Sequence, residues 1–95
     1  KIQPDLVVLK NGNNKFTYIV TKKDGTIVDN AKASFLLTQP HSTREDKMIE
    51  SVPFSKGYYI ISNIKISKAG RYTLKFRAKV GDFTSYFSLG AYLKP

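Results

Sequence analysis

One alternating stretch late in the chain constrains the fold more than any other. After the bend Ala69-Gly70, apolar side chains occupy every second position, and the positions between them are polar or basic. The apolar set is Tyr72, Leu74, Phe76 and Ala78, and the other set is Arg71, Thr73, Lys75, Arg77 and Lys79. A period of two is typical of a strand with one face in the core and one in solvent. The chain is therefore expected to be built on a half-buried sheet.

Shorter apolar runs separated by turn residues predict further strands. They lie at residues 6–9, 16–20, 33–38, 48–52 and 57–62, with a last strand lined by Phe83, Phe87 and Leu89. Short strands spaced by about 8–12 residues are typical of β-sandwiches. We therefore predict an all-β, immunoglobulin-like β-sandwich of about seven antiparallel strands, with an open or closed barrel as the alternative. Tyr72, just after the bend, is expected to form a tyrosine corner.

Turn residues set the boundaries between these strands. Residues 11–14, Asn-Gly-Asn-Asn, are expected to form a turn, and Asp24-Gly25 a tight hairpin, because both segments favour positive φ angles. Pro40 should end the strand before it, since proline has no N–H for a sheet ladder. The polar residues 41–47 that follow are predicted to be a loop, with a helical turn started by Ser42 or Thr43 as the alternative.

Length and composition limit the classes of protein that this chain can be. Its 95 residues predict a single domain, residues 1–95, and the absence of cysteine excludes disulfides and thiolate metal sites. The net charge is +9, but the basic residues are scattered, so we expect a solvated outer face rather than a nucleic-acid site, with an anionic membrane surface as the second alternative. The chain begins at Lys1, and we expect a signal peptide or N-terminal anchor in the full-length protein.

The chemistry-bearing residues do not converge on an enzyme active site. Seven scattered carboxylates and one histidine offer few ways to build acid–base or nucleophilic catalysis, so the chain is predicted not to be an enzyme. His41 and Met48 are nevertheless ligand types that suit copper, which makes copper the one cofactor that the sequence suggests. Both residues would reach one ion only if the loop between them folded back. The alternative is a solvated histidine and a methionine in the core.

The order of the motifs resembles the periplasmic domain of the FixH family and its YtkA-like relatives. The resemblance is carried by residues 16–20, Lys23-Asp24-Gly25, residues 31–37, Gln39-Pro40-His41-Ser42, Gly57-Tyr58-Tyr59 and Ala69-Gly70-Arg71-Tyr72-x-Leu74. It implies a domain on the periplasmic side of the bacterial inner membrane, held there by an N-terminal anchor. It also implies a role in the assembly of a cbb-type haem-copper oxidase, beside a copper-transporting ATPase.

On this resemblance the domain acts by contact with a membrane protein complex. The expected contact residues are His41, Ser42, Arg44, Glu45 and Asp46 of the polar loop, with Tyr59 and Ile61 from the strand at 57–62. That strand is apolar on both faces, so it is expected either to lie centrally between covered faces or to expose its outer side as an apolar patch. The alternative from another functional class is a generic immunoglobulin-like adhesion or ligand-binding module of a surface protein.

Overall fold

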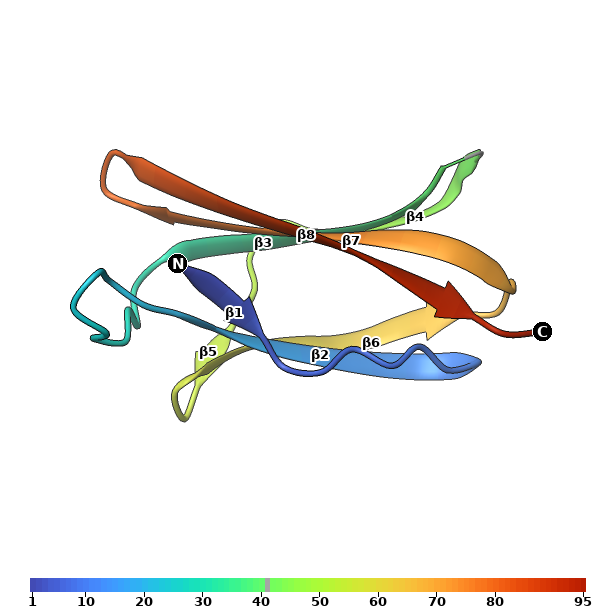
Figure 1. Cartoon of the computed structure of the whole chain (residues 1–95), viewed down its shortest axis with the longest axis horizontal. Helices are drawn as coiled ribbons and strands as arrows, with labels where there is room; N and C mark the ends of the chain where they lie inside the picture. The colour runs from blue at the N-terminus through green and yellow to red at the C-terminus, as the bar shows by residue number, and fades with distance from the viewer. Residues whose placement is uncertain (41) are drawn as a thin grey trace.

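The protein is a β-sandwich of two antiparallel sheets, seen edge-on in the computed structural model (Figure 1). The structure describes residues 1–40 and 42–95, and for residues 42–45 it describes the backbone alone. One sheet contains β1 (Ile2–Pro4), β2 (Gly12–Val20), β6 (Tyr58–Ile66) and β5 (Phe54–Ser55). The other contains β4 (Ser42–Ile49), β3 (Lys32–Gln39), β7 (Gly70–Val80) and β8 (Phe83–Leu93). The predicted all-β sandwich is confirmed, with eight strands rather than about seven.

The strand order is that of an immunoglobulin-type sandwich. The order β1-β2-β6-β5 corresponds to the A-B-E-D sheet, and β8-β7-β3 corresponds to G-F-C, with β4 beside it in the place of an added C′ strand. Because the described strands divide into two separate sheets, the barrel alternative is wrong. No helix in the described part of the chain has the length and apolar character needed to span a membrane.

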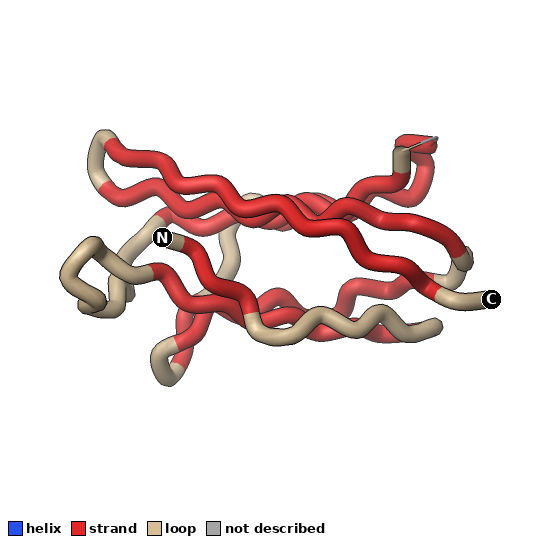
Figure 2. Tube along the Cα trace, in the orientation of Figure 1, coloured by secondary structure: helices blue, strands red, loops and turns tan. Residues whose placement is uncertain are grey.

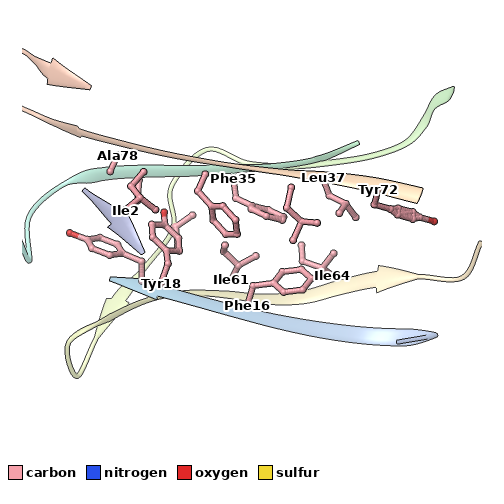
Figure 3. Close-up of a cluster of buried hydrophobic side chains, with 14 of the residues drawn as sticks. Ile2, Phe16, Tyr18, Phe35, Leu37, Ile61, Ile64, Tyr72 and Ala78 are labelled. Atoms are coloured by element: carbon pink, nitrogen blue, oxygen red, sulfur yellow. The ribbon is translucent and has the colours of Figure 1, made fainter. Parts of the chain in front are cut away.

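The core lies between the two sheets and is centred on aromatic rings (Figure 3). Phe16 and Tyr18 of β2 meet Phe35 of β3 and Phe76 of β7, with ring centroids 5.6 Å apart for Phe16–Phe35 and 5.1 Å apart for Tyr18–Phe76. Phe35 and Phe76 are neighbours within their own sheet, 5.3 Å apart. Each fully buried ring of this size stabilises the fold by about 2–3 kcal/mol. These contacts join the sheets face to face.

The predicted division of β7 into a buried face and a solvent-facing face is confirmed. Tyr72, Leu74, Phe76 and Ala78 are all buried, whereas the residues between them are exposed or half-buried. The tyrosine corner is also confirmed, because the Tyr72 hydroxyl donates a hydrogen bond to the carbonyl oxygen of Lys68, four residues upstream. Gly70, which begins the strand, has a φ of +135° that other residues rarely adopt.

Two-residue turns with positive φ angles join the hairpins. Lys56 and Gly57 have φ angles of 51° and 91°, which suit a type I′ turn between β5 and β6. The turn between β7 and β8 is Gly81-Asp82, where Gly81 with a φ of 59° suits type II′. The predicted Asp24-Gly25 turn is confirmed locally by the hydrogen bond from Lys22 N–H to the Thr26 carbonyl oxygen. It closes only an isolated bridge, since the chain then crosses to the other sheet.

The predicted first strand, residues 6–9, is wrong. Leu6 is 92% exposed, and residues 5–11 run as a loop alongside the sheet, drawn in tan in Figure 2. The first strand is instead β1, and β2 already begins at Gly12, inside the predicted turn. The reason lies in Asn14, which is buried. Its side chain donates hydrogen bonds to the carbonyl oxygens of Lys10, Gly12 and Ile64, and it accepts one from the Lys10 N–H.

The predicted polar loop and its alternative, a helical turn started by Ser42 or Thr43, are also wrong over residues 42–47, since Ser42–Ile49 is strand β4. β4 forms an edge of its sheet and pairs only with β3, in a register that places Leu36 opposite Met48. An edge strand with a solvated face accepts charged residues, so its composition resembled that of a loop. The strand predicted at residues 48–52 accordingly ends at Ile49.

The last strand differs from prediction in its burial. Phe83, expected to line the core, is 82% exposed at the end of the β7–β8 hairpin. Phe87 packs its ring 6.3 Å from that of Phe76 but keeps one side in solvent, and Leu89 is half-buried against the core. Since β8 is a sheet edge, its inward residues have no strand beyond them to complete their burial.

Candidate functional site

The outer face of the β4-β3-β7-β8 sheet carries a concentration of positive charge, which we call the basic face. It consists of Lys32 from β3 and Arg71, Lys75, Arg77 and Lys79 from β7, all exposed. These side chains share one face because each alternates with a core residue of its own strand. The pairing of β3 with β7 adds Lys32 to the row of cations that the alternation of β7 already places on one face.

The register between β3 and β7 places like charges together. Lys32 lies directly opposite Lys79, while Ser34 is opposite Arg77 and Leu36 opposite Lys75. Like charges that are direct cross-strand neighbours destabilise a sheet. Among the residues that the structure describes, no carboxylate forms an ion pair with any cation of the basic face. Glu50 lines a cleft with three of these cations, but the cations outnumber it, so the face keeps an excess of positive charge that favours a negatively charged ligand.

Exposed tyrosines border the basic face. Tyr86 and Tyr92 lie on β8, opposite Arg77 and Arg71 respectively, and both rings are largely in solvent. The Arg77 guanidinium carbon lies 6.0 Å from the centroid of the Tyr86 ring, at the limit of a cation–π contact. Arginine beside exposed tyrosine is a combination enriched at protein interfaces.

A shallow cleft opens on the same face, over β3, β4 and the end of β7. Its volume is about 410 Å³, and it is lined by Lys32, Ser34, Met48, Glu50, Arg77 and Lys79. The lining contains three cations and one carboxylate. Its chemistry therefore suits an anionic group that also brings an apolar part to the thioether of Met48.

The same cleft is a poor place for a copper ion. Met48 is 65% exposed, and three cationic side chains share its cleft, so a metal cation there would be repelled. The chain from Ser42 to Met48 is an extended strand, which spans about 20 Å at roughly 3.3 Å per residue. The fold-back needed to bring Met48 to the same ion as His41 is therefore absent from residues 42–48. His41 itself lies outside the described residues.

Most of the predicted contact residues on β4 cannot be placed as side chains. His41 and the side chains of Ser42, Arg44 and Glu45 lie outside the described part of the structure. Asp46 is described and half-buried, and one of its carboxylate oxygens is buried without a hydrogen-bond partner among the described residues. The described residues contain no group of three or more His, Cys, Asp or Glu side chains that could hold a metal ion.

The predicted contacts at Tyr59 and Ile61 are wrong, because both side chains point into the core. Tyr59 is 1% exposed and Ile61 is fully buried. β6 lies centrally in its sheet, so its inward face is covered by the other sheet, and its outer face instead carries Tyr58 and the half-buried Ile60. The alternation of the strand was read correctly, but the faces were assigned the wrong way round.

Tyr59 has a structural role that explains its burial. Its hydroxyl donates a hydrogen bond to the Val28 carbonyl oxygen at 2.7 Å and accepts one from the Ala31 N–H at 3.0 Å. The ring stacks on Tyr18, with centroids 5.4 Å apart. Burial raises the pKa of both phenols, and for Tyr18 the neighbouring Tyr59 adds to the increase. Tyr59 therefore holds in place the segment that connects β2 to β3, and it does not contact a partner.

The basic face was missed at the level of sequence although its residues were visible there. The alternation of β7 already predicted an outward row of cations, and that row was interpreted as solvated surface. What could have indicated a site was the second row, on β3, but its register with β7 becomes known only from the pairing of the strands.

Comparison with known proteins places the chain in a family. The model of the YtkA-like family matches residues 2–77, which include β1 to β6 and most of β7. No match was found among the curated proteins, and none among the solved structures. The matched region contains strands of both sheets and four cations of the basic face, Lys32, Arg71, Lys75 and Arg77, whereas Lys79 and strand β8 with its two tyrosines lie beyond it. The chain belongs to the YtkA-like family.

Proposed function

We propose that this domain is a non-enzymatic accessory module that assists the assembly of a cbb-type haem-copper oxidase by contact. On this proposal it lies on the periplasmic side of the bacterial inner membrane and is anchored N-terminally in the full-length protein. Membership of the YtkA-like family and the motif resemblance to FixH proteins support the proposal. The observation that carries the contact mechanism is the basic face with its two exposed tyrosines.

The basic face is the proposed contact surface for an acidic segment of the membrane complex. Lys32 and Lys79 repel each other in the free domain, so an acidic partner between them relieves an unfavourable contact as well as forming new ones. Tyr86 and Tyr92 at the border add apolar area and hydrogen-bonding hydroxyls. Because most of these charges are solvent-exposed, the affinity should fall as the salt concentration rises.

A charge-reversal experiment with full-length protein tests this surface. The variant Arg77→Glu/Lys79→Glu reverses two charges on the basic face, and the control Lys22→Glu/Lys23→Glu makes the same change of net charge in the exposed 22–26 turn. We expect membranes to yield oxidase subunits with the wild type and the control, and at least about tenfold fewer with the first variant. Equal thermal midpoints of the two variants exclude unfolding as the cause.

Two results would contradict the proposal. Recovery of no oxidase subunits by the wild-type protein would remove the assembly role, and recovery of glycans or surface proteins instead would favour the adhesion module. Equal loss in both variants would show that net charge, rather than the basic face, governs binding.

Copper handling is the second part of the proposal, and a titration of the domain with cuprous ion tests it separately. Met48 lies among cations, so we expect Met48→Leu to leave the cuprous affinity unchanged. A loss of tenfold or more in that variant would return Met48 to the ligand set. A loss of cuprous affinity in His41→Ala alone would assign the ion to His41 without Met48. Unchanged affinity in both variants would mean that neither residue binds copper and that the partners handle it.

A further inference from the structure

Strand β8 is an unprotected sheet edge, unlike the other three edges of the sandwich. The sequence of Phe83–Leu93 contains no charge, no proline and no irregularity in its pairing with β7. Natural edge strands are usually protected by one of these features or by being short. β1 has three residues and ends in Pro4, β5 has two and follows Pro53, and β4 is rich in charged residues and has a register shift.

The backbone of β8 offers a regular row of hydrogen-bonding groups. In a two-residue hairpin the flanking residues, here Val80 and Phe83, form a hydrogen-bonded pair, and such pairs alternate along an antiparallel ladder. The amides of odd-numbered residues from Phe83 therefore face β7. Those of the even-numbered residues face away from it: Thr84, Tyr86, Ser88, Gly90 and Tyr92. No strand of the described chain pairs with this edge, although β1 of the other sheet lies close to β8.

Gly90 lies within this row, and neither its backbone conformation nor its neighbours in the chain require a glycine there. The other five glycines have positive φ angles, but Gly90 does not, and a Cβ added there would meet nothing closer than the Tyr72 carbonyl oxygen at 3.9 Å. Glycine weakens a strand interior and often marks a place where another backbone or ligand approaches closely. At Gly90 the surface has a shallow hollow of about 310 Å³, lined by Arg71, Ala91 and Tyr92.

We propose that β8 pairs antiparallel with β8 of a second copy of this chain, about a two-fold axis through Ser88. This register overlaps the full strand and joins the free amides in pairs: Ser88 with Ser88, Tyr86 with Gly90, and Thr84 with Tyr92 of the other copy. Each large outward side chain then faces a small one, and Tyr86 fills the hollow at Gly90. On the inward face Phe87 meets Leu89, and the exposed Phe83 meets Leu93.

The self-complementary register argues for a second copy as the occupant, and the distribution of charge permits it, because β8 itself carries no charge. The chain carries a net charge of +9, so most contacts between two copies repel. Of the two long edge strands in the described chain, β4 carries charged residues and β8 carries none. Two copies that meet along β8 therefore place no like charges opposite each other, and the cations of β7 lie one strand away from the interface in each copy. Screening by salt should therefore strengthen the pairing, whereas it should weaken the binding of an acidic partner.

Charge substitution at the proposed axis tests the pairing with the whole chain. We expect the wild type to dimerise in analytical ultracentrifugation, more tightly at higher salt. Ser88→Lys and Ser88→Glu each place two like charges opposite each other at the axis, and each should weaken the dimer about tenfold or more. Mixing the two variants should restore a mixed dimer, which a folding defect would not allow. The control Ser55→Lys, on the edge strand β5, should leave dimerisation unchanged.

Other results would overturn the inference. A wild type that stays monomeric at high concentration and salt would remove the pairing. A dimer that is insensitive to Ser88→Lys, or equally weakened by Ser55→Lys, would place the interface elsewhere. A mixture of the two Ser88 variants that forms no mixed dimer would contradict the two-fold register.

Discussion

At the scale of single residues, the stacked pair Tyr18 and Tyr59 allows the contribution of ring packing to stability to be measured separately from that of hydrogen bonding. Both rings are buried, but Tyr59 has two hydrogen bonds, whereas the Tyr18 hydroxyl is buried without a partner among the described residues. We expect Tyr59→Phe to lower the free energy of unfolding by about 1–3 kcal/mol, because a buried N–H and carbonyl lose their partner. Tyr18→Phe should be neutral or stabilising. Urea denaturation of both variants measures the difference, and equal losses would contradict this account.

The same pair predicts how stability depends on pH. Burial raises the pKa of Tyr18 above the ordinary value of about 10 for tyrosine. The folded state therefore holds the proton more tightly than the unfolded state, so this contribution to stability is complete below about pH 10 and is lost as the pH rises above it. Urea midpoints between pH 8 and 11 should fall more steeply for the wild type than for Tyr18→Phe. Parallel curves would exclude Tyr18 as the cause.

The structural role of Asn14 could not be predicted from the sequence, because the residues around it are typical of a turn. In Asn-Gly-Asn-Asn it indicates a turn, but its side chain instead satisfies backbone groups of the 10–12 segment and of β6. We expect Asn14→Ala to lower the free energy of unfolding by about 2–4 kcal/mol, since several buried polar groups lose their partner at once. The exposed neighbour Asn13 provides a control, and Asn13→Ala should have little effect.

At the scale of elements, two glycines in strands or their turns should respond in opposite ways to the same substitution. Gly57 has a φ of 91° in the β5–β6 turn, whereas Gly90 lies in β8 without a positive φ. Gly57→Ala is therefore expected to destabilise the domain by about 1 kcal/mol or more, and Gly90→Ala to be neutral or stabilising by a few tenths. Thermal denaturation at low protein concentration measures both in the monomer. A loss at Gly90 would mean that its backbone is strained.

Elements with strong local signals could be predicted from the sequence, and those set by their neighbours could not. β7 was correct in both faces, because a strand beside other strands under a covered face must alternate. The end of β3 before Pro40 and the start of β7 at Gly70 could be predicted, because proline and glycine restrict or extend what the backbone can do at those positions. β4 could not be recognised from its polar residues, because its strand conformation depends on pairing with β3 rather than on burial. β6 was found, but its inward face depends on which sheet covers it.

The candidate site was less predictable than the fold for a related reason. A site on the face of a sheet is assembled by register, and the row Arg71, Lys75, Arg77 and Lys79 becomes a surface only with Lys32 beside it. Tyr59 and Ile61 were predicted to be contact residues on the family resemblance, because their strand is apolar on both faces, and they belong instead to the core. Hydrophobicity indicates that a residue will be covered, but it does not say whether the cover is the chain itself or a partner.

At the scale of the whole molecule, uncompensated charge predicts a salt dependence of stability. A net charge of +9 destabilises the compact state by self-repulsion, and screening reduces that repulsion. We expect the thermal midpoint to rise between 0.02 and about 0.3 M salt. Lys32→Gln, which removes the direct neighbour of Lys79, should raise the midpoint at low salt and flatten the salt dependence more than Lys10→Gln in an exposed loop. Equal responses would contradict the pairwise repulsion.

The strand order also determines the order in which the chain can fold. β7 and β8 are joined by two residues, so their hairpin closes a minimal loop, whereas β2 must wait for β6, across three intervening strands. Loop closure slows such distant pairings relative to local hairpins. β5 and β6 close an equally short loop, so these local hairpins are expected to form before β2 meets β6, and β3 gains its second neighbour only when β7 is present. The core between the two sheets is therefore expected to close only after β7, which supplies Leu74 and Phe76, has been made.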